Sequence, residues 1–404
     1  MSNDFDIKHD FGVYDNMPDL AYFDSASTTL VPRVAVSATS SFLDSVVASA
    51  RRGAHRLAVK GGAIVEETRK KLATFLETDS SQISFQKSIS SAVASFVYGF
   101  DWKTSGKNKL VIGQSEENSI LVSLLRSAKV LGLEIDIVPI DEKGTLRIDE
   151  LEKSVDDNTG LVAVSHVSPG PGIRNPIQTV SDIVHQSNAL LITDATRSAG
   201  LTNEKLTKLG PDILLLSGNI GFMGPPGLAV QWIDKSIGEA HKPGILGASS
   251  VTKVENGSFE VALQPDKFEP GFLNLPAIAG LNSSLDYLIR LKSQGLVKHL
   301  AKLSRYMVQR LTEIDDLILY GTPDENSTIF GFNLNPDAGI SCHDVALFLD
   351  ESNIAVRSGI ICAHPLVQAI ADEGLIQASI HGYNSQDDID RLVDTITIIA
   401  SELL

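Results

Sequence analysis

The chain has 404 residues, 43% of them hydrophobic and 21% charged, with a formal net charge of −16 at pH 7. This composition predicts a globular protein with a large core and two domains. The negative charge argues against nucleic acid or an anionic membrane as the main partner, because both require clustered Lys and Arg.

We expect a cytoplasmic protein, since no signal-peptide pattern opens the sequence and no apolar run reaches the length of a membrane span. The two cysteines, Cys342 and Cys362, suggest neither a disulfide framework nor a metal site by their spacing. No histidine shows metal-ligand spacing either, so we predict no metal.

Short apolar runs alternate with helical patterns from residue 109 onward. Strands are predicted at 109–113, 134–140, 160–167, 190–195, 213–217 and 228–233, and helices at 118–132 and 176–188. This alternation indicates an α/β fold with a mainly parallel sheet that helices cover on both faces. Ligands of such sheets bind beyond the carboxyl ends of the strands, which selects Ser168, Asp194 and Ser217 as site candidates.

The pattern changes after about residue 265. Helices are predicted at 276–292, 294–314, 343–351 and from 386, with strands at 330–334, 355–359 and 377–382. We therefore divide the chain into an N-terminal segment (1–20) that packs with the small domain, a large domain (21–265) and a smaller α+β domain (266–404). No glycine- or serine-rich linker separates the last two, so we expect a firm interface.

Eight segments carry a resemblance to one family. They are YFDSASTTLVP (22–32), RGAH (52–55), VSHVSPGPGIRNPI (164–177), TDATRSAG (193–200), SGNIGFMGPPG (217–227), KFEPGFLN (267–274), VRSGIICAHPL (356–366) and YNSQDDIDRLV (383–393). In this order and approximate spacing, they resemble the class V aminotransferase-fold enzymes, especially cysteine desulfurases. The resemblance implies the fold-type I pyridoxal-phosphate (PLP) enzyme fold and a homodimer with sites at the subunit interface.

The chain departs from this family where the cofactor would be attached. The resemblance implies a His-Lys pair, with the lysine bound covalently to PLP, where this sequence has Asn219 and Ile220 next to Ser217. Isoleucine has no amine, so it cannot form that bond. Glu117 occupies the position of a histidine that stacks on the cofactor ring, and a carboxylate is repelled by a π-face.

Further departures fall on the phosphate and substrate positions that the resemblance implies. Ser88 and Ser90 lie in the turn that would hold the phosphate at a helix N-terminus, but its glycine and one hydroxyl are absent. Phe272 replaces a threonine that reaches the phosphate from the other subunit. Pro169 replaces an asparagine and Arg197 a glutamine.

Other implied site residues remain. Asp194 matches the carboxylate that pairs with the pyridinium nitrogen, and Arg357 the arginine that binds the substrate carboxylate. Cys362 matches the cysteine that accepts sulfur. Arg52 and His55 match residues that approach the site of the partner subunit.

Plainer interpretations of three of these residues stay open. Asp194 could simply bond backbone amides of the turn after its strand. Cys362 could be a small buried hydrophobe, the common fate of a free cysteine, and a reactive thiol would need positive charge from Arg357 or His364. Arg197 could pair with Asp194 across the turn, as an internal substitute for the cofactor cation.

Three functions compete. The first is a non-catalytic paralogue of a cysteine desulfurase, with no cofactor, that acts through partners in sulfur transfer or iron–sulfur assembly, as a homodimer or with an active paralogue. The second is an active PLP-dependent desulfurase or aminotransferase with a lysine from elsewhere, although Lys208 lies on the wrong side of its strand. The third is a small-molecule-binding protein that uses Arg197, Glu117 and Arg357 in the vacated pocket.

Overall fold

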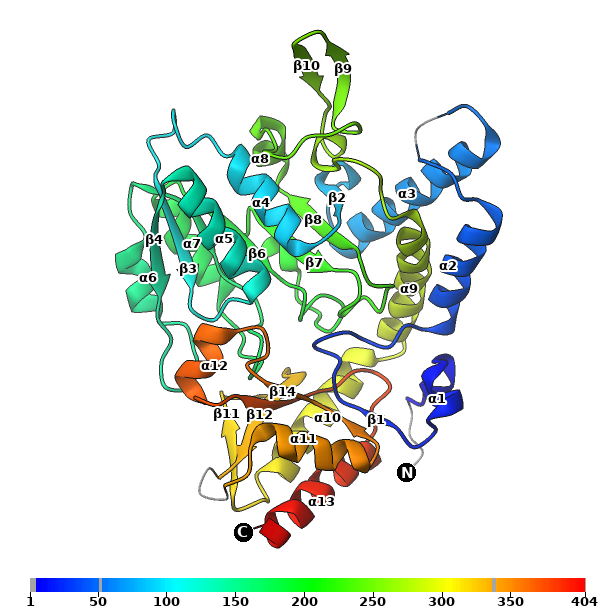
Figure 1. Cartoon of the computed structure of the whole chain (residues 1–404), viewed down its shortest axis with the longest axis vertical. Helices are drawn as coiled ribbons and strands as arrows, with labels where there is room; N and C mark the ends of the chain where they lie inside the picture. The colour runs from blue at the N-terminus through cyan, green and yellow to red at the C-terminus, as the bar shows by residue number, and fades with distance from the viewer. Residues whose placement is uncertain (1–4, 51–52, 336–338, 404) are drawn as a thin grey trace.

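The computed structural model describes residues 5–50, 53–335 and 339–403. Its largest sheet has seven strands in the order β2-β8-β7-β6-β5-β3-β4 (Figure 1). These strands are β2 (Ile83–Gln86), β3 (Lys109–Gly113), β4 (Glu134–Val138), β5 (Thr159–Ala163), β6 (Leu190–Asp194), β7 (Ile213–Ser217) and β8 (Ala229–Ile233).

The prediction of a mainly parallel sheet is confirmed. Neighbours from β4 to β7 pair in parallel, and β8 runs antiparallel to both β2 and β7. The connection between β7 and β8 contains no helix. A parallel pairing of β8 with β7 would require a longer crossover connection, so the two strands pair antiparallel. Because β2 and β7 both run antiparallel to β8, β2 points in the same direction as the parallel strands. The carboxyl ends of β2, β3, β6 and β7 therefore lie at one edge of the sheet.

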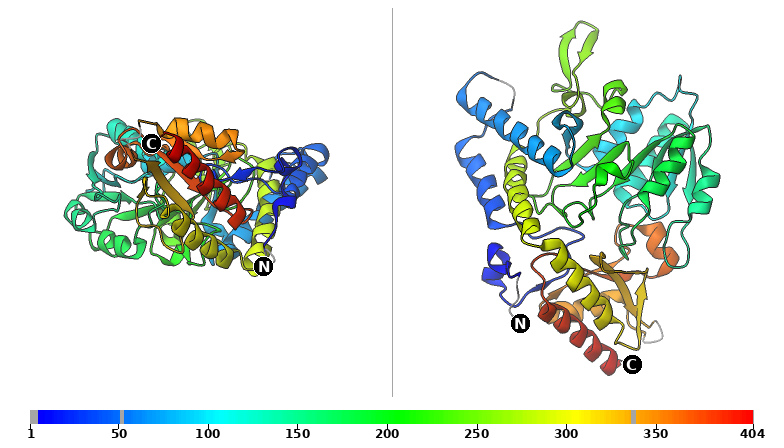
Figure 2. Two further views of the ribbon diagram at one scale, coloured as in Figure 1. Left: turned by 90° about the horizontal axis from the view of Figure 1, so that it is seen from below. Right: turned by 180° about the vertical axis from the view of Figure 1, so that it is seen from behind.

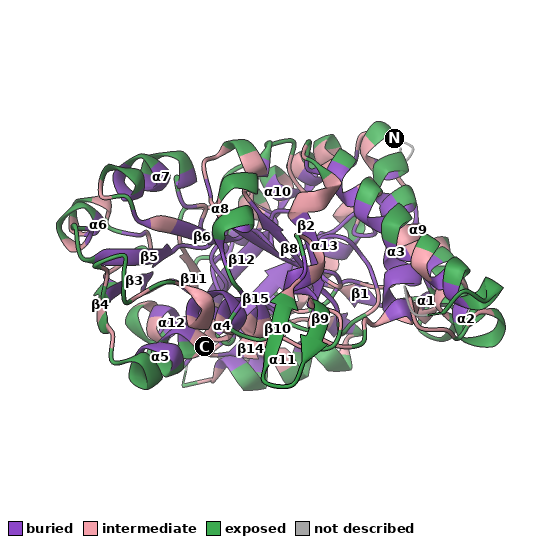
Figure 3. Cartoon of the chain, turned by 90° about the horizontal axis from the view of Figure 1, so that it is seen from above, coloured by how far each residue is buried: buried purple, intermediate pink, exposed green. Residues whose placement is uncertain are grey.

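Helices cover both faces of this sheet, as Figure 3 shows from above. α4 (Ile89–Gly99) and α5 (Asn118–Leu131) lie on one face, and α6 (Ile148–Ser154) and α7 (Ile177–Gln186) on the other. Successive strand residues belong to different apolar clusters, Ile112 to the one under α4 and α5 and Val111 to the one under α6 and α7. This two-residue period produces strands that are buried on both sides.

The C-terminal part forms the predicted smaller α+β unit (Figure 2). Its antiparallel sheet has the order β11-β12-β15-β14. The strands are β11 (Leu317–Tyr320), β12 (Ile329–Leu334), β14 (Arg357–Gly359) and β15 (Leu375–Ser379), and the helices α9 (Leu275–Ser293), α10 (Leu296–Leu311), α11 (Cys342–Glu351), α12 (His364–Ile370) and α13 (Gln386–Leu403).

The N-terminal segment joins this small unit. After η1 (Lys8–Asp10) and α1 (Val13–Asn16), β1 (Ala21–Tyr22) pairs in parallel with β13 (Ile354–Ala355). Lys8 Nζ lies 2.7 Å from Asp388 Oδ1 of α13. One apolar cluster runs from β7 through α9 to α13, so the two units share a continuous core. The domain boundaries at residues 20 and 265 stay a sequence-based division.

Two features of the large unit were not predicted. α2 (Arg33–Ser45) and α3 (Arg56–Phe75) form an arm against α9, and β9 (Val251–Glu255) and β10 (Ser258–Val261) form a projecting hairpin (Figure 1). The remaining short elements are η2 (Ser80–Gln82), η3 (Leu206–Lys208), α8 (Lys235–Ala240) and η4 (Asp266–Phe268). None of the described helices combines the length and apolar composition needed to cross a membrane.

Candidate functional site

A hollow of about 310 Å³ lies at the edge where the parallel strands end. The β7–β8 loop, the turn before α4 and the start of α5 contribute to its wall. The lining residues are Lys87, Ser88, Ile89, Ser90, Glu117, Ser119, Thr196, Ser217, Asn219, Ile220, Gly227, Leu228 and Ala229. Six of the predicted site residues, Ser88, Ser90, Glu117, Ser217, Asn219 and Ile220, therefore line one cavity, as expected beyond the carboxyl ends of parallel strands.

The β7–β8 loop places Ile220 against this cavity with 9% of its surface exposed. Asn219 is fixed beside it, because Ser217 Oγ donates to Asn219 Oδ1 at 2.7 Å and Thr29 N donates to Asn219 O at 2.9 Å. Gly221 follows at φ +58°, where a Cβ would collide with the carbonyl oxygen of Ala199. The backbone thus holds an aliphatic side chain at the cavity wall, and the loop 217–227 contains no lysine.

An ion pair lies beside Ile220 in the site. Arg197 Nη1 is 2.7 Å from Glu117 Oε2, and their side chains are 5% and 22% exposed. The suggested pairing of Arg197 with Asp194 is therefore corrected. Glu117 stands at the first turn of α5 and reaches the guanidinium, whereas Asp194 Oδ1 accepts the backbone N–H of Thr196 at 2.8 Å.

These carboxyl groups titrate differently. Burial alone would raise the pKa of Glu117, but the Arg197 guanidinium outweighs it and holds that pKa below its ordinary value. Burial, reinforced by the charge of Glu117, raises the pKa of Asp194 to about 6. Burial likewise raises the pKa of Glu116 to about 7, although Ser165 donates to it from both N and Oγ at 2.6 Å.

Cys362 lies next to this region on the small unit, in the loop between β14 and α12. It is exposed, so it is not the buried hydrophobe considered from sequence. Arg357 Nη2 donates to Cys362 Sγ at 2.9 Å, and Arg357 Nη1 donates to Ser27 Oγ at 2.9 Å. Asn118 N donates to Cys362 O at 2.8 Å, which ties the loop to the start of α5. The other cysteine, Cys342, is buried.

The turn before α4 forms another part of the wall. Ser88 caps the helix by accepting Ser91 N at 3.1 Å, and Ser90 Oγ donates to Ser119 O at 3.0 Å. Both hydroxyl groups thus already have intramolecular partners. Sequence reasoning did not identify Lys87, Glu116 or Thr196 as part of this site. The only signal available in the sequence was their position close to predicted site residues.

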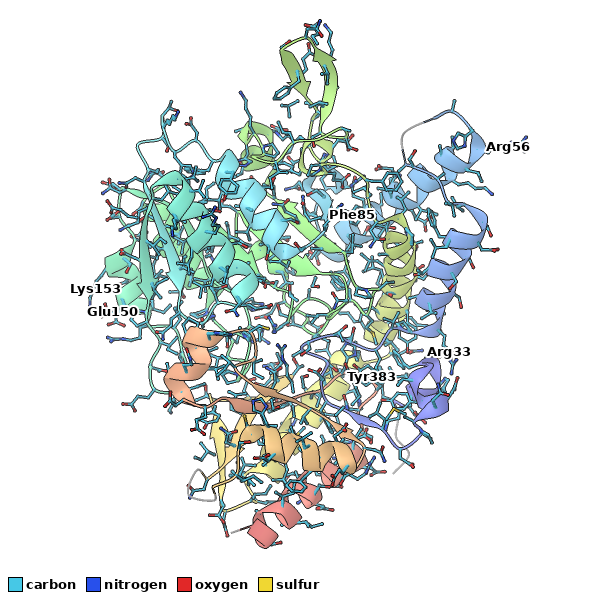
Figure 4. The ribbon with its side chains drawn as sticks, in the orientation of Figure 1. Arg33, Arg56, Phe85, Glu150, Lys153 and Tyr383 are labelled. Atoms are coloured by element: carbon cyan, nitrogen blue, oxygen red, sulfur yellow. The ribbon has the colours of Figure 1, made fainter. Side chains whose placement is uncertain are left out.

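The remaining predicted residues lie elsewhere in the single chain. Pro169 is buried in a turn whose Gly170 O accepts Gln377 Nε2 at 2.8 Å, so it lies at the junction with β15. Phe272 is 63% exposed and lines two other hollows. His55 caps α3 through Ala58 N at 3.3 Å, at the outer end that Arg56 marks in Figure 4. Arg52 lies outside the described residues, among which no cluster suits a metal ion.

The model of the class-V aminotransferase family matches residues 21–392. The chain belongs to this family. A probable cysteine desulfurase of Methanothermobacter thermautotrophicus is 31% identical over 399 residues, or 98% of each protein. The apo structure of a cysteine desulfurase from Thermococcus onnurineus NA1 has a TM-score of 0.90 at 28% identity and covers 98% of each chain. The predicted fold-type I architecture is confirmed.

The expectation that the protein takes no cofactor is wrong. It was drawn from Ile220, but the family is PLP-dependent. A C-DES variant is similar in fold, with a TM-score of 0.83 at 19% identity over 97% of this chain and 99% of that one.

The charged and hydrogen-bonding groups of the cavity suit PLP, but the cavity offers no group for its covalent attachment. The N-terminus of α4 and the Lys87 ammonium suit an anionic group. Asp194 is 4% exposed and forms no ion pair among the described residues, and burial is the main cause of its raised pKa. Ile220 offers no amine. The residues thus favour a cofactor held by charge and hydrogen bonds alone.

Proposed function

We propose that this cysteine desulfurase-like protein does not release sulfur from cysteine and acts through protein partners in sulfur transfer or iron–sulfur assembly. The observation that carries the proposal is Ile220, which lines the cavity in a loop without lysine. Bound PLP supplies an electron sink for a substrate carbanion, and turnover also needs a nearby group that moves the proton. An aliphatic side chain at Ile220 cannot do so.

The neighbouring acid does not replace the missing base. Glu117 is held by Arg197 at 2.7 Å, and its lowered pKa keeps it ionised and paired. A carboxylate in such a pair is a poor proton acceptor, because protonation would leave the buried guanidinium unpaired. In the proposed protein, Glu117 and Arg197 shape the cavity and neutralise each other.

Cys362 supports the partner role. Its thiol is exposed and accepts a hydrogen bond from Arg357. A persulfide on an active desulfurase can transfer its terminal sulfur to Cys362. The S–S bond of the donor breaks, an S–S bond to Cys362 forms, and the donor is left as a thiol. No external oxidant is needed.

We also propose that the chain forms a homodimer or a mixed dimer with an active paralogue. Exposed apolar side chains gather on the hairpin and the segment after it, where Phe259, Leu263 and Phe272 are all more than half exposed. An apolar surface of this kind is typical of a protein interface.

The test measures sulfide release and sulfur uptake separately. With saturating PLP and cysteine, the purified protein should release no more sulfide than the buffer, while an active desulfurase serves as positive control. Ile220→Lys should remain inactive, because the Glu117–Arg197 pair still occupies the site. Turnover by the parent protein at an ordinary enzymatic rate would refute the proposed loss of catalysis.

The second arm adds a catalytic amount of active desulfurase. Mass spectrometry should then find a persulfide on Cys362 and none on Cys342. Affinity capture should recover sulfur-transfer or iron–sulfur assembly proteins. If neither cysteine is labelled and capture returns only the protein itself, the partner role fails.

A further inference from the structure

A second hollow, of about 410 Å³, lies between the large and small units. The large unit contributes Arg174 and the segment 201–204 to its wall, and the small unit contributes α10 and the segment 325–328. No residue of this wall lines the candidate cavity. Junctions between domains are common positions for ligands, and pockets for small molecules typically measure about 300–1,000 Å³. The hollow is therefore large enough for a small organic molecule.

A much smaller space adjoins this hollow on its inner side. It measures about 20 Å³, which is room for one water molecule or one oxygen atom of a ligand. The residues that line both spaces are Arg174, Leu201, Thr202, Asn326, Ser327 and Thr328. The smaller space also reaches Arg197 and Ser198, which are only 6% and 2% exposed. It is thus the buried inner end of the hollow.

Arg197 has an unused donor in this part of the molecule. Its Nη1 is 2.7 Å from Glu117 Oε2, but its Nε is buried and has no hydrogen-bond partner among the described residues. Buried N–H groups almost always have an acceptor, because a buried donor without one loses its hydrogen bond to water and gains nothing in return. The Nε–H group therefore indicates an acceptor that the described side chains do not supply.

The charges around the inner space favour an anionic acceptor. Arg174 and Arg197 line it, and neither Asp nor Glu is among its lining residues. Arg174 Nη1 donates to Glu204 and, at 3.3 Å, to His166 Nε2, which leaves Nη2 and Nε of Arg174 without a partner in the described part of the chain. Burial and the charge of Arg174 lower the pKa of His166 to about 3, so this ring is neutral at pH 7. Two guanidinium groups with donors to spare suit a carboxylate.

The wall of the outer hollow is apolar on one side. Val297, Leu300 and Ala301 of α10 contribute to it. The acid at its edge, Glu325, is paired with Arg305 Nη1 at 2.7 Å. The hollow thus combines a positive inner end with an apolar surface that suits a short carbon chain.

We propose that this hollow binds a small organic carboxylate. One carboxylate oxygen accepts a hydrogen bond from Arg197 Nε and the other from Arg174, while the carbon chain lies against α10. Because Arg197 also holds Glu117, such a ligand contacts the ion pair of the candidate cavity from its far side. The inference goes beyond the proposed function, and its failure would leave the measurements of sulfide release and of Cys362 labelling unaffected.

Saturation-transfer NMR titrations of the purified protein with butyrate and with butyramide test the proposal. The two probes have the same carbon chain and differ in charge. Butyrate should bind at least tenfold more tightly than butyramide, about the difference that one charge-assisted hydrogen bond makes.

Variants of the wall locate the binding. Arg174→Met should weaken butyrate binding about tenfold and leave butyramide binding unchanged, because it removes charge and keeps the volume. Ala301→Trp should abolish the binding of both probes by filling the hollow. Lys302→Trp, at an exposed residue of α10 outside the lining, is the matched control and should change neither.

The contact with Arg197 has its own test. The double variant Glu117→Gln with Arg197→Gln removes both members of the ion pair, so that no buried charge is left unpaired. It should bind butyrate about tenfold more weakly and butyramide as the parent does. Urea unfolding of each variant confirms that the fold is retained.

Four results would overturn the proposal. If the parent shows no saturable butyrate binding, the inner space holds water alone. Equal affinity for butyrate and butyramide would exclude recognition of the charge. Undiminished binding in Ala301→Trp would place the probe elsewhere, and unchanged butyrate affinity in the double variant would exclude Arg197.

Discussion

Two loops meet at the candidate site and present different chemistry. The β7–β8 loop of the large unit places Ile220 against the cavity, beside the closed Glu117–Arg197 pair. The loop between β14 and α12 of the small unit presents the exposed thiol of Cys362 with Arg357 against it. A hydrogen bond from Asn118 N to Cys362 O at 2.8 Å joins the two regions.

The comparison shows that the chemistry of a site can differ between its interior and its rim. In the interior, Ile220 is apolar and Glu117 is paired with Arg197, which suits packing. Both loops carry strain, since Ile361 and Cys362 of the rim adopt φ of +51° and +52° and Met223 of the β7–β8 loop adopts a φ of +59°. Non-glycine residues in this left-handed region cost about 1–2 kcal/mol each, and such strain persists only where tertiary contacts impose it. The exposed thiol of Cys362 therefore distinguishes the rim from the interior, and backbone strain does not.

The largest expected effect concerns the rim. Cys362→Ser should abolish persulfide uptake from an active desulfurase, because the sulfur acceptor is gone, whereas Cys342→Ser should retain it because Cys342 is buried. Mass spectrometry of the intact protein and its peptides makes the measurement. Undiminished labelling of Cys362→Ser would remove the contrast between the two loops.

The second prediction concerns the interior ion pair. Glu117→Gln should lower the free energy of unfolding by about 3–5 kcal/mol, because it leaves the buried Arg197 guanidinium unpaired. Adding Arg197→Gln should recover part of this loss. Urea unfolding provides the values.

Lys153→Gln is a matched control for this pair. It breaks the exposed pair that Lys153 forms with Glu150 at 2.8 Å, shown in Figure 4. Such surface pairs contribute about 0–1 kcal/mol, so the change should be small. Equal effects in both variants would mean that the interior pair is solvated.

The third prediction is a pH dependence. The pKa of Asp194 rises from its ordinary 3.8 to about 6. The contribution of this group to the free energy of unfolding is therefore fully present below pH 4 and is lost as the pH rises through 6. Stability should fall over this range by up to about 3 kcal/mol from this group, at about 1.4 kcal/mol for each pKa unit. Asp194→Asn should flatten that fall in urea unfolding between pH 4 and pH 8. Glu116 adds a fall of the same sign nearer pH 7, which the variant should keep.

The smallest effect is expected at Phe272. Because it is 63% exposed, Phe272→Thr should change the unfolding free energy of the single chain by no more than about 0.5 kcal/mol. If the side chain fills a pocket of a partner subunit, dimerisation should weaken about tenfold in sedimentation equilibrium. Phe348→Thr, at an exposed phenylalanine of α11 outside this surface, is the control. Equal dimerisation of Phe272→Thr and the parent would place Phe272 outside the interface.

Much of the fold follows from the sequence alone. Apolar runs such as 109–113 and 213–217 coincide with β3 and β7, because a strand buried on both faces must be continuously apolar. The arm of α2 and α3 was missed. The helix α3 begins at Arg56 after its cap at His55, and a histidine cap is an uncommon sequence signal.

The sequence by itself determined which residue types stand at the ends of the strands, including Ile220 in a loop without lysine. Only the tertiary structure decided how they combine. Arg197 pairs with Glu117, which follows a different strand, while Asp194 accepts a hydrogen bond from the backbone of its own turn. Lys87 is brought to the cavity lining, and Cys362 is exposed beside α5, for the same reason. The distance between groups far apart in the chain depends on how the sheet, the helices and the small unit pack together.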